Sequence, residues 1–339
     1  MRSKERLPYG ALRTGLIPFV KRLPDRRRMC GNMPRPATIS CFLALSLGCL
    51  AGFAQQDRPA PPSPDHADVR YGPHERNVLD LWLADVDEPA PLAIYYHGGG
   101  FRGGDKRSIN IELLAGLRDA GIHVAAVNYR LSGTAIYPAQ MHDSARALQF
   151  LRLNADRYGI DPTRVGAFGG SAGAGISQWL GFHDDLADPD NADPVLRQST
   201  RLTAVGPFAA QASYDPRYIK KLMNTTQTHP ALVYFFGMES ADDADDSKFF
   251  KAFEDSSPIN HLTADDPPIL VFYPQANEPL PPDSTGEQHI HHPKFGFALK
   301  EKADALGVEC TVLLREDHPK GFPVGEYVEF FRTKLLEGD

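Results

Sequence analysis

Two glycine clusters hold the residues of this chain that could do chemistry. They are His97-Gly98-Gly99-Gly100-Phe101 and Gly169-Gly170-Ser171-Ala172-Gly173. The second has the spacing G-x-S-x-G, in which a serine hydroxyl is raised on a sharp turn between a strand and a helix. Glycines on both sides of Ser171 permit such a turn, because a Cβ there would collide with the neighbouring strand or helix. Ser171 is therefore the candidate nucleophile.

The first cluster has the composition of a loop that presents backbone N–H groups to a reacting oxygen. When a serine attacks an acyl carbon, negative charge develops on the carbonyl oxygen, and preorganised N–H donors stabilise it. We predict that Gly98, Gly99 and Ala172 supply these donors and form an oxyanion hole.

Each cluster follows a run that is typical of a buried strand, and such runs alternate with helix-like stretches along the chain. The predicted strands lie at 78–82, 92–96, 123–127, 165–168, 202–208, 269–273 and 310–314. The predicted helices cover about 109–120, 141–158, 173–182, 295–306 and 324–336. This order predicts an α/β fold with a mostly parallel sheet of about eight strands and helices on both faces.

Residues 213–263 interrupt the alternation with a helix-like insertion that is rich in aromatic residues. It could cover the site as a lid. We favour packing within a small subdomain over substrate contact as the role of its aromatic side chains.

These motifs, in this order, resemble the α/β-hydrolase family, in its esterase and lipase branch with HGGG and G-x-S-x-G, close to feruloyl and acetyl-xylan esterases. The resemblance extends from about residue 67 to the end of the chain. It implies the α/β-hydrolase fold and a Ser-His-acid mechanism, with the acid after the penultimate core strand and the histidine after the last.

The acid position departs from the family pattern. The strand-like run 267–273 is followed by Pro274-Gln275-Ala276-Asn277-Glu278, where the family usually shows G-x-x-D. Asn277 occupies the apparent acid position, and an amide can orient an imidazole but cannot supply the negative charge that stabilises an imidazolium. Glu278 is the nearest carboxylate and a second candidate.

The histidine position is also altered, since His318 is separated by two extra residues from the glycine of the family's H-G-F ending. We predict His318 as the base. A second cluster, His289-Ile290-His291-His292, admits three interpretations: a substitute base, a metal site, or a cap for the helix that follows Pro293. We favour the cap, because these histidines lack spaced carboxylate or cysteine partners. His97 is expected to shape its glycine loop through local hydrogen bonds.

No metal or cofactor is expected for this chemistry. The run 183–193, from His183 to Asp193, concentrates oxygen ligands and could bind calcium, but it lacks the central glycine and terminal glutamate of an EF-hand loop. We interpret it as a solvated acidic turn.

The composition favours a small-molecule or polysaccharide ester substrate over nucleic acid, because the net charge is −7 and no basic stripe is interleaved with aromatic residues. Residues 1–28 are basic and 39–54 apolar, which predicts a signal peptide within a leader spanning 1–54. Residues 55–66 are interpreted as a linker and 67–339 as one catalytic domain. These features predict export to the periplasm or medium, with no stable membrane insertion after cleavage.

Two functions are consistent with the residues. The first is an exported serine carboxylic-ester hydrolase, for which the resemblance implies acetyl or feruloyl esters of polysaccharides as substrates. The second, suggested by the departures at Asn277 and His318, is a catalytically impaired relative that binds a glycan or small ligand.

Overall fold

The structure is a computed structural model that describes residues 60–337. The predicted leader and residues 55–59 of the predicted linker lie outside these residues. Within them, an eight-stranded sheet has the strand order β1-β2-β4-β3-β5-β6-β7-β8. The strands are β1 (His66–Arg70), β2 (Val78–Trp82), β3 (Ala90–Tyr96), β4 (His123–Val127), β5 (Ile160–Gly170), β6 (Ala204–Phe208), β7 (Ile269–Tyr273) and β8 (Cys310–Leu314).

The sheet is parallel from β4 to β8, and β2 pairs antiparallel with both β1 and β4. Alternate residues of its strands enter two separate apolar layers. In β3, Leu92, Ile94 and Tyr96 join one layer, and Ala93 and Tyr95 join the other. A strand whose two faces are both covered reads as a continuous apolar run, which is why these strands were predictable.

Eleven α-helices lie in the described part of the chain. They are α1 (Ile111–Asp119), α2 (Ala139–Leu153), α3 (Ala155–Tyr158), α4 (Ala172–Phe182), α5 (Pro216–Met223), α6 (Pro230–Phe236), α7 (Phe250–Ser256), α8 (Pro258–His261), α9 (Gly286–His289), α10 (Lys294–Leu306) and α11 (Val324–Arg332). Short turns of other helix types include η5 (Arg315–Asp317), which follows β8.

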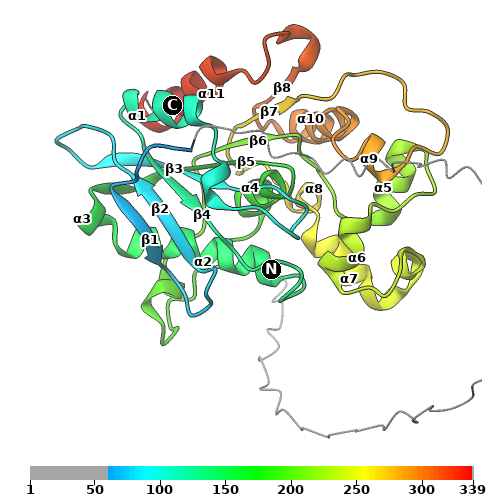
Figure 1. The fold of residues 1–339 in the computed structure, drawn as a ribbon, viewed down its shortest axis with the longest axis horizontal. Coiled ribbons are helices and arrows are strands. Elements are labelled where there is room, and N and C mark those ends of the chain that lie inside the picture. The colour runs from blue at the N-terminus through cyan, green and yellow to red at the C-terminus, as the bar shows by residue number, and fades with distance from the viewer. Residues whose placement is uncertain (1–59, 338–339) are drawn as a thin grey trace, which may run out of the picture. The chain divides into compact units, whose positions relative to one another are not determined.

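The helices divide between the two faces of the sheet. Apolar residues of α1 and α11 join one layer, and those of α2, α4 and α10 join the other. Figure 1 shows α1 and α11 together on one side of the sheet and α2 on the other. The predicted α/β-hydrolase fold, with a mostly parallel sheet and helices on both faces, is confirmed.

The insertion forms helices α5 to α8, and its aromatic side chains mostly pack on one another. Phe235 is the centre of this group: it stacks on Phe101 of the HGGG loop at 4.0 Å and contacts the rings of Tyr137, Tyr214 and Phe236. Gly100, in the same loop, lies against Ala231 of α6. The insertion therefore packs against the glycine loop, and its role as a lid stays a prediction.

Within residues 60–337, none of the helices has both the length and the apolar character needed to cross a lipid bilayer.

Candidate active site

Ser171 lies at the turn between β5 and α4, as the G-x-S-x-G spacing predicts. Its φ is +52° and its ψ −118°, a sparsely populated conformation for a residue with a side chain. The turn is held by close packing: a Cβ on Gly173 would lie 1.9 Å from the carbonyl oxygen of Tyr96. The Ser171 N–H also donates to the carbonyl of Phe208, at the end of β6. Strand, strained serine and helix are thus built as one unit.

The nearest base to this hydroxyl is His291. Its Nε2 lies 2.9 Å from Ser171 Oγ. His291 belongs to the loop between β7 and α10, and it follows the short helix α9. In the tautomer that carries its proton on Nδ1, the serine hydroxyl donates to Nε2, which is the arrangement that a general base requires.

Burial of His291 lowers its pKa to about 4, and the nearby His229 contributes in the same direction. The imidazole is therefore neutral at pH 7 and able to accept a proton. Within residues 60–337, no carboxylate forms a hydrogen bond or an ion pair with this ring. The described pair is a serine–histidine dyad.

The His291 backbone position is set by a buried glutamine. Gln211 Nε2 donates to the carbonyl of Ile290 at 2.7 Å and to the carbonyl of Ala209 at 2.9 Å. This side chain joins the loop after β6 to the residue that precedes His291.

The predicted base, His318, is in another place. Its Nδ1 lies 3.4 Å from Glu326 of α11, and its ring packs edge-on against Phe272. Phe272 belongs to the apolar layer that contains α1 and α11, so His318 lies on that side of the sheet. The helix that follows His291, α10, belongs to the layer on the other side. The structure therefore brings His291 to Ser171, and His318 is paired with α11 instead.

The predicted acid residues do not contact the dyad histidine either. The Asn277 N–H donates to Glu316 at 2.7 Å, and the Glu278 carbonyl accepts from His292 Nε2 at 2.9 Å. Both side chains are exposed. The backbone of this segment links neighbouring loops. Within the described residues, neither side chain forms a hydrogen bond with the His291 ring.

The His289–His292 cluster divides its roles. His292 Nδ1 accepts from the N–H of Lys294, the first residue of α10, as the capping interpretation expects. His291 instead occupies the place of a base, which was the first of the three interpretations. No sequence signal distinguished the two, because the path of the loop from 274 to 293 decides which ring reaches Ser171.

The HGGG loop lies beside Ser171, and the side chains of His97 and Arg76 hold its backbone in place. A Cβ on Gly98 would lie 3.5 Å from the Ser171 Cβ, which places this glycine next to the serine. His97 Nδ1 lies 2.8 Å from the Gly98 carbonyl, and the guanidinium of Arg76 lies 3.1 Å from His97 Nε2. Since arginine only donates, Nε2 accepts and Nδ1 carries the proton that binds Gly98.

Those contacts orient the backbone donors. In a planar trans peptide the N–H points opposite to the C=O, so the fixed Gly98 carbonyl fixes the direction of the Gly99 N–H. Gly99 itself has φ +106°, a conformation that favours glycine. Ala172 is the first residue of α4, where N–H groups have no partner within the helix. Gly98 thus lies beside Ser171 and Ala172 directly follows it, and the assignment of the three N–H groups as oxyanion donors stays a prediction.

The acidic side chains between His183 and Asp193 mostly accept hydrogen bonds from nearby residues of the same loop. Asp185 accepts from the N–H of Thr200, Asp193 caps the next helical turn, and Asn191 donates to Asp188. Asp193 also pairs with Arg146. These contacts fit the predicted acidic turn.

Known proteins resemble this chain in sequence and in fold. LipM, a probable carboxylic ester hydrolase of Mycobacterium tuberculosis, is 29% identical over 63% of this chain and 48% of its own length. The esterase LipQ of the same organism is 29% identical over 74% of this chain and 56% of its own length. The chain spans about half the length of these curated relatives.

Solved structures share the fold. A truncated carbohydrate esterase from gut microbiota superposes with a TM-score of 0.64 at 21% identity, covering 81% of this chain and 99% of its own. An acetyl ester-xyloside bifunctional hydrolase from Caldicellulosiruptor lactoaceticus has a TM-score of 0.58 at 20% identity, covering 76% of this chain and 86% of its own.

The BD-FAE family model matches residues 79–289, which is more than half of the chain and includes both glycine motifs. Together with the fold, this match shows that the chain belongs to the BD-FAE family, within the esterase and lipase branch of the α/β hydrolases.

Proposed function

We propose that this protein is a serine carboxylic-ester hydrolase whose nucleophile is Ser171 and whose base is His291. The observation that carries the proposal is the 2.9 Å contact between His291 Nε2 and a Ser171 hydroxyl raised on a strained turn. The names of the M. tuberculosis relatives support the same class of reaction.

The reaction follows from the geometry. Ser171 Oγ attacks the ester carbonyl carbon while its proton passes to His291 Nε2. The N–H groups of Gly98, Gly99 and Ala172 stabilise the oxygen that becomes negative. When the C–O bond to the alcohol breaks, His291 returns the proton to the departing oxygen. A water then attacks the acyl-serine, with His291 again taking and returning the proton, and releases the acid.

The substrate and location are finer parts of the proposal. We infer acetyl or feruloyl esters of polysaccharides as the substrate class, supported by the resemblance of the motifs and by the carbohydrate esterase and acetyl ester-xyloside hydrolase of the same fold. Export rests on the basic and apolar residues at 1–54.

A second candidate is favoured by one observation: among the residues that the structure describes, no carboxylate pairs with His291. In a triad, the buried acid holds the imidazole in its tautomer and stabilises the imidazolium, and disabling it lowers kcat by about 10⁴. A dyad without it could serve a protein that binds a glycan ester and turns it over slowly.

The test is covalent labelling of the purified protein with a fluorophosphonate probe, peptide mapping, and turnover of p-nitrophenyl acetate. We expect one label, on Ser171, and loss of both labelling and turnover in Ser171→Ala. His291→Ala is expected to abolish turnover, whereas the matched variant His318→Ala retains it.

The reverse outcome, with activity lost in His318→Ala and kept in His291→Ala, would assign the base to His318. Absence of labelling in folded protein would reject the esterase. Ligand affinity should then be measured on the unmodified chain.

A further inference from the structure

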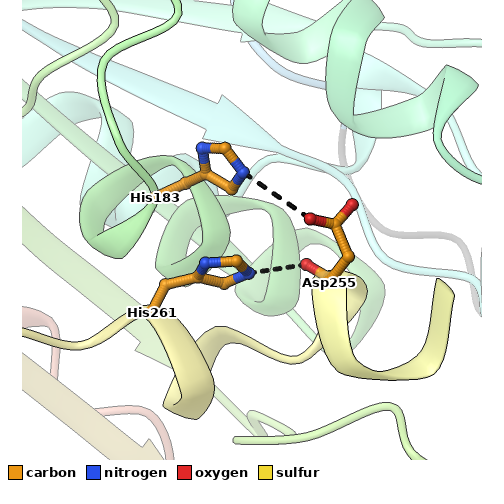
Figure 2. Close-up of side chains that lie close together, drawn as sticks. All are labelled: His183, Asp255 and His261. Atoms are coloured by element: carbon orange, nitrogen blue, oxygen red, sulfur yellow. Dashed lines mark hydrogen bonds and ion pairs between the residues drawn. The ribbon is translucent and has the colours of Figure 1, made fainter. Parts of the chain in front are cut away.

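A cluster of two histidines and one aspartate lies away from Ser171, where the insertion meets the end of the nucleophile helix. His183 follows the last residue of α4, Asp255 lies in α7, and His261 ends α8. Figure 2 shows the three side chains close together, with His183 directed at the Asp255 carboxylate and His261 at the Asp255 main-chain carbonyl. One ring nitrogen of each histidine and one Asp255 carboxylate oxygen all lie within 4.8 Å of one another.

The outer contacts orient His183 as a ligand. Its Nδ1 lies 2.9 Å from the carbonyl of Asp184, so Nδ1 carries the proton and Nε2 faces Asp255. Histidines that bind metal typically donate their other ring N–H to a carbonyl or carboxylate in this way, which fixes the ring and its tautomer.

The carboxylate is held in the same manner. Its Oδ2 accepts the hydroxyl of Tyr137, which leaves Oδ1 facing His183. The Asp255 carbonyl accepts from Trp179 Nε1 at 2.9 Å and from His261 Nε2 at 2.7 Å. Since a carbonyl only accepts, His261 carries its proton on Nε2, and Nδ1 is the ring nitrogen left for an ion. The cluster is therefore anchored by groups from α4, from the residue that follows His183 and from the loop before α2.

The spacing fits a shared ion better than a hydrogen bond. His183 Nε2 and Asp255 Oδ1 are 3.9 Å apart, which is beyond hydrogen-bond distance. Two ligands that are each about 2.1 Å from one tetrahedral ion are about 3.4 Å apart. The His183–Asp255 pair would therefore close by about half an ångström, and the most separated pair of ligand atoms, which lies within 4.8 Å, by up to about 1.4 Å.

We propose that His183, Asp255 and His261 bind one divalent transition-metal ion of the zinc class. Two imidazoles and a carboxylate are a ligand set that Zn²⁺ accepts, with a fourth position open to water. All three residues are partly exposed, which gives the ion a path from solvent. The proposal departs from the expectation that the protein needs no metal.

The ion would be structural. α4 has 11 residues and begins directly after Ser171, so its far end is about 17 Å along the axis from the nucleophile. A metal there joins α7 and α8 of the insertion to the end of α4. The inference does not depend on the esterase proposal.

The experiment uses the full chain, with any affinity tag removed and with bound metal stripped by a chelator. Zn²⁺ is titrated by calorimetry, and Co²⁺ replaces it for visible absorption. We expect one equivalent of Zn²⁺, a rise in Tm, and tetrahedral Co²⁺ bands without the charge-transfer absorption of a thiolate ligand, which would instead implicate a cysteine.

His183→Ala, His261→Ala and Asp255→Asn are each expected to weaken Zn²⁺ binding by at least ~100-fold, and Tyr137→Phe, which removes only an outer contact, by ~10-fold. The matched control is His74→Ala, an exposed histidine away from the cluster, which should bind as the wild type does. The Tm of each variant, measured in chelator, shows whether that variant is folded. If His261→Ala is misfolded, His261→Gln is used in its place.

Failure of the wild type to bind Zn²⁺, binding that survives in all three ligand variants, or a thiolate Co²⁺ spectrum would each overturn the proposal. In the first case His183 and Asp255 form only an ion pair.

Discussion

The His291 imidazole lies against Ser171, and no carboxylate of residues 60–337 pairs with its ring. Its basicity is therefore set by its burial and its neighbours. Burial lowers its pKa to about 4, and the positive charge that His229 can carry adds to the effect. Catalysis needs the neutral ring, which is the dominant form at every pH above this value.

We therefore expect kcat/KM for an ester, or the rate of fluorophosphonate labelling, to stay level down to about pH 5 and to halve near pH 4. A free histidine would give half the maximal rate near pH 6.5. The measurement is the pH profile of this rate in the wild type and in His318→Ala, with the ester or probe well below its saturating concentration. An acidic limb near 6.5, or one that moves in His318→Ala, would contradict His291 as the base.

At the scale of elements, the HGGG loop depends on a side chain outside the motif. The guanidinium of Arg76 contacts His97 Nε2 and donates to the carbonyls of Tyr129 and Gly104, which ties the loop to the strand end beside it. Without Arg76 the tautomer of His97 is free to change and the Gly98 carbonyl loses its fixed partner.

Arg76→Met keeps the length of the side chain and removes its donors. We expect kcat/KM to fall ~10 to 100-fold with KM nearly unchanged, which is less than the 10² to 10³-fold cost of deleting an oxyanion donor outright. Arg70→Met, which removes an exposed arginine contact to the His74 carbonyl, is the matched control. Equal losses in both variants would show a general effect on folding.

The loop after β7 likewise depends on Gln211, which is buried and donates to the Ile290 carbonyl. In Gln211→Leu the loop loses this donor, and we expect kcat to fall ~10-fold because His291 is no longer held at Ser171. Gln149→Leu is a matched control: Gln149 is equally buried and donates to the Gln198 carbonyl, far along α2.

Both glutamine variants should lose ~1 to 3 kcal/mol of unfolding free energy, since each leaves a partly buried carbonyl without its donor. Only Gln211→Leu should lose turnover. A fall in kcat that is the same in the two variants would make Gln211 a purely structural residue.

The sequence predicted the elements better than the loops. Runs such as 92–96 and 269–273 are apolar throughout because both faces of the sheet are covered, so their strands were found within a residue or two. β1 was missed, since its residues, His66–Arg70, are mostly polar and mostly exposed at the sheet edge. The predicted helix 141–158 is two helices, divided at Asn154.

The serine turn was predictable for a local reason, and the histidine that contacts Ser171 was not. The turn at Ser171 needs glycine neighbours that the sequence displays, whereas His291 is 120 residues away and reaches the serine only through the path of one long loop. Four histidines lie in the two loops that follow β7 and β8, and spacing alone does not order them by distance.

At the scale of the whole molecule, several histidines are buried in the neutral form, and this links folding to pH. Burial lowers the pKa of His97 and of His291 to about 4. In the unfolded chain both titrate near 6.5. Between these values the unfolded state binds protons that the native state does not, so stability rises with pH across this window and falls as the solution is acidified. His183, whose pKa is raised by Asp255, contributes with the opposite sign.

We expect the free energy of unfolding to be level above about pH 7 and to fall as the pH drops from about 6.5 to 4, by up to about 3 kcal/mol for each of the two histidines. His291→Gln removes one of these titrations, so its stability should depend less steeply on pH than that of the wild type. Urea unfolding at several pH values, with chelator present to exclude metal binding, measures both slopes. The exposed His74→Gln should leave the slope unchanged.

If His291→Gln and the wild type lose stability in parallel on acidification, His291 is not neutral in the folded protein at mildly acid pH, and the buried dyad at Ser171 would have to be reconsidered.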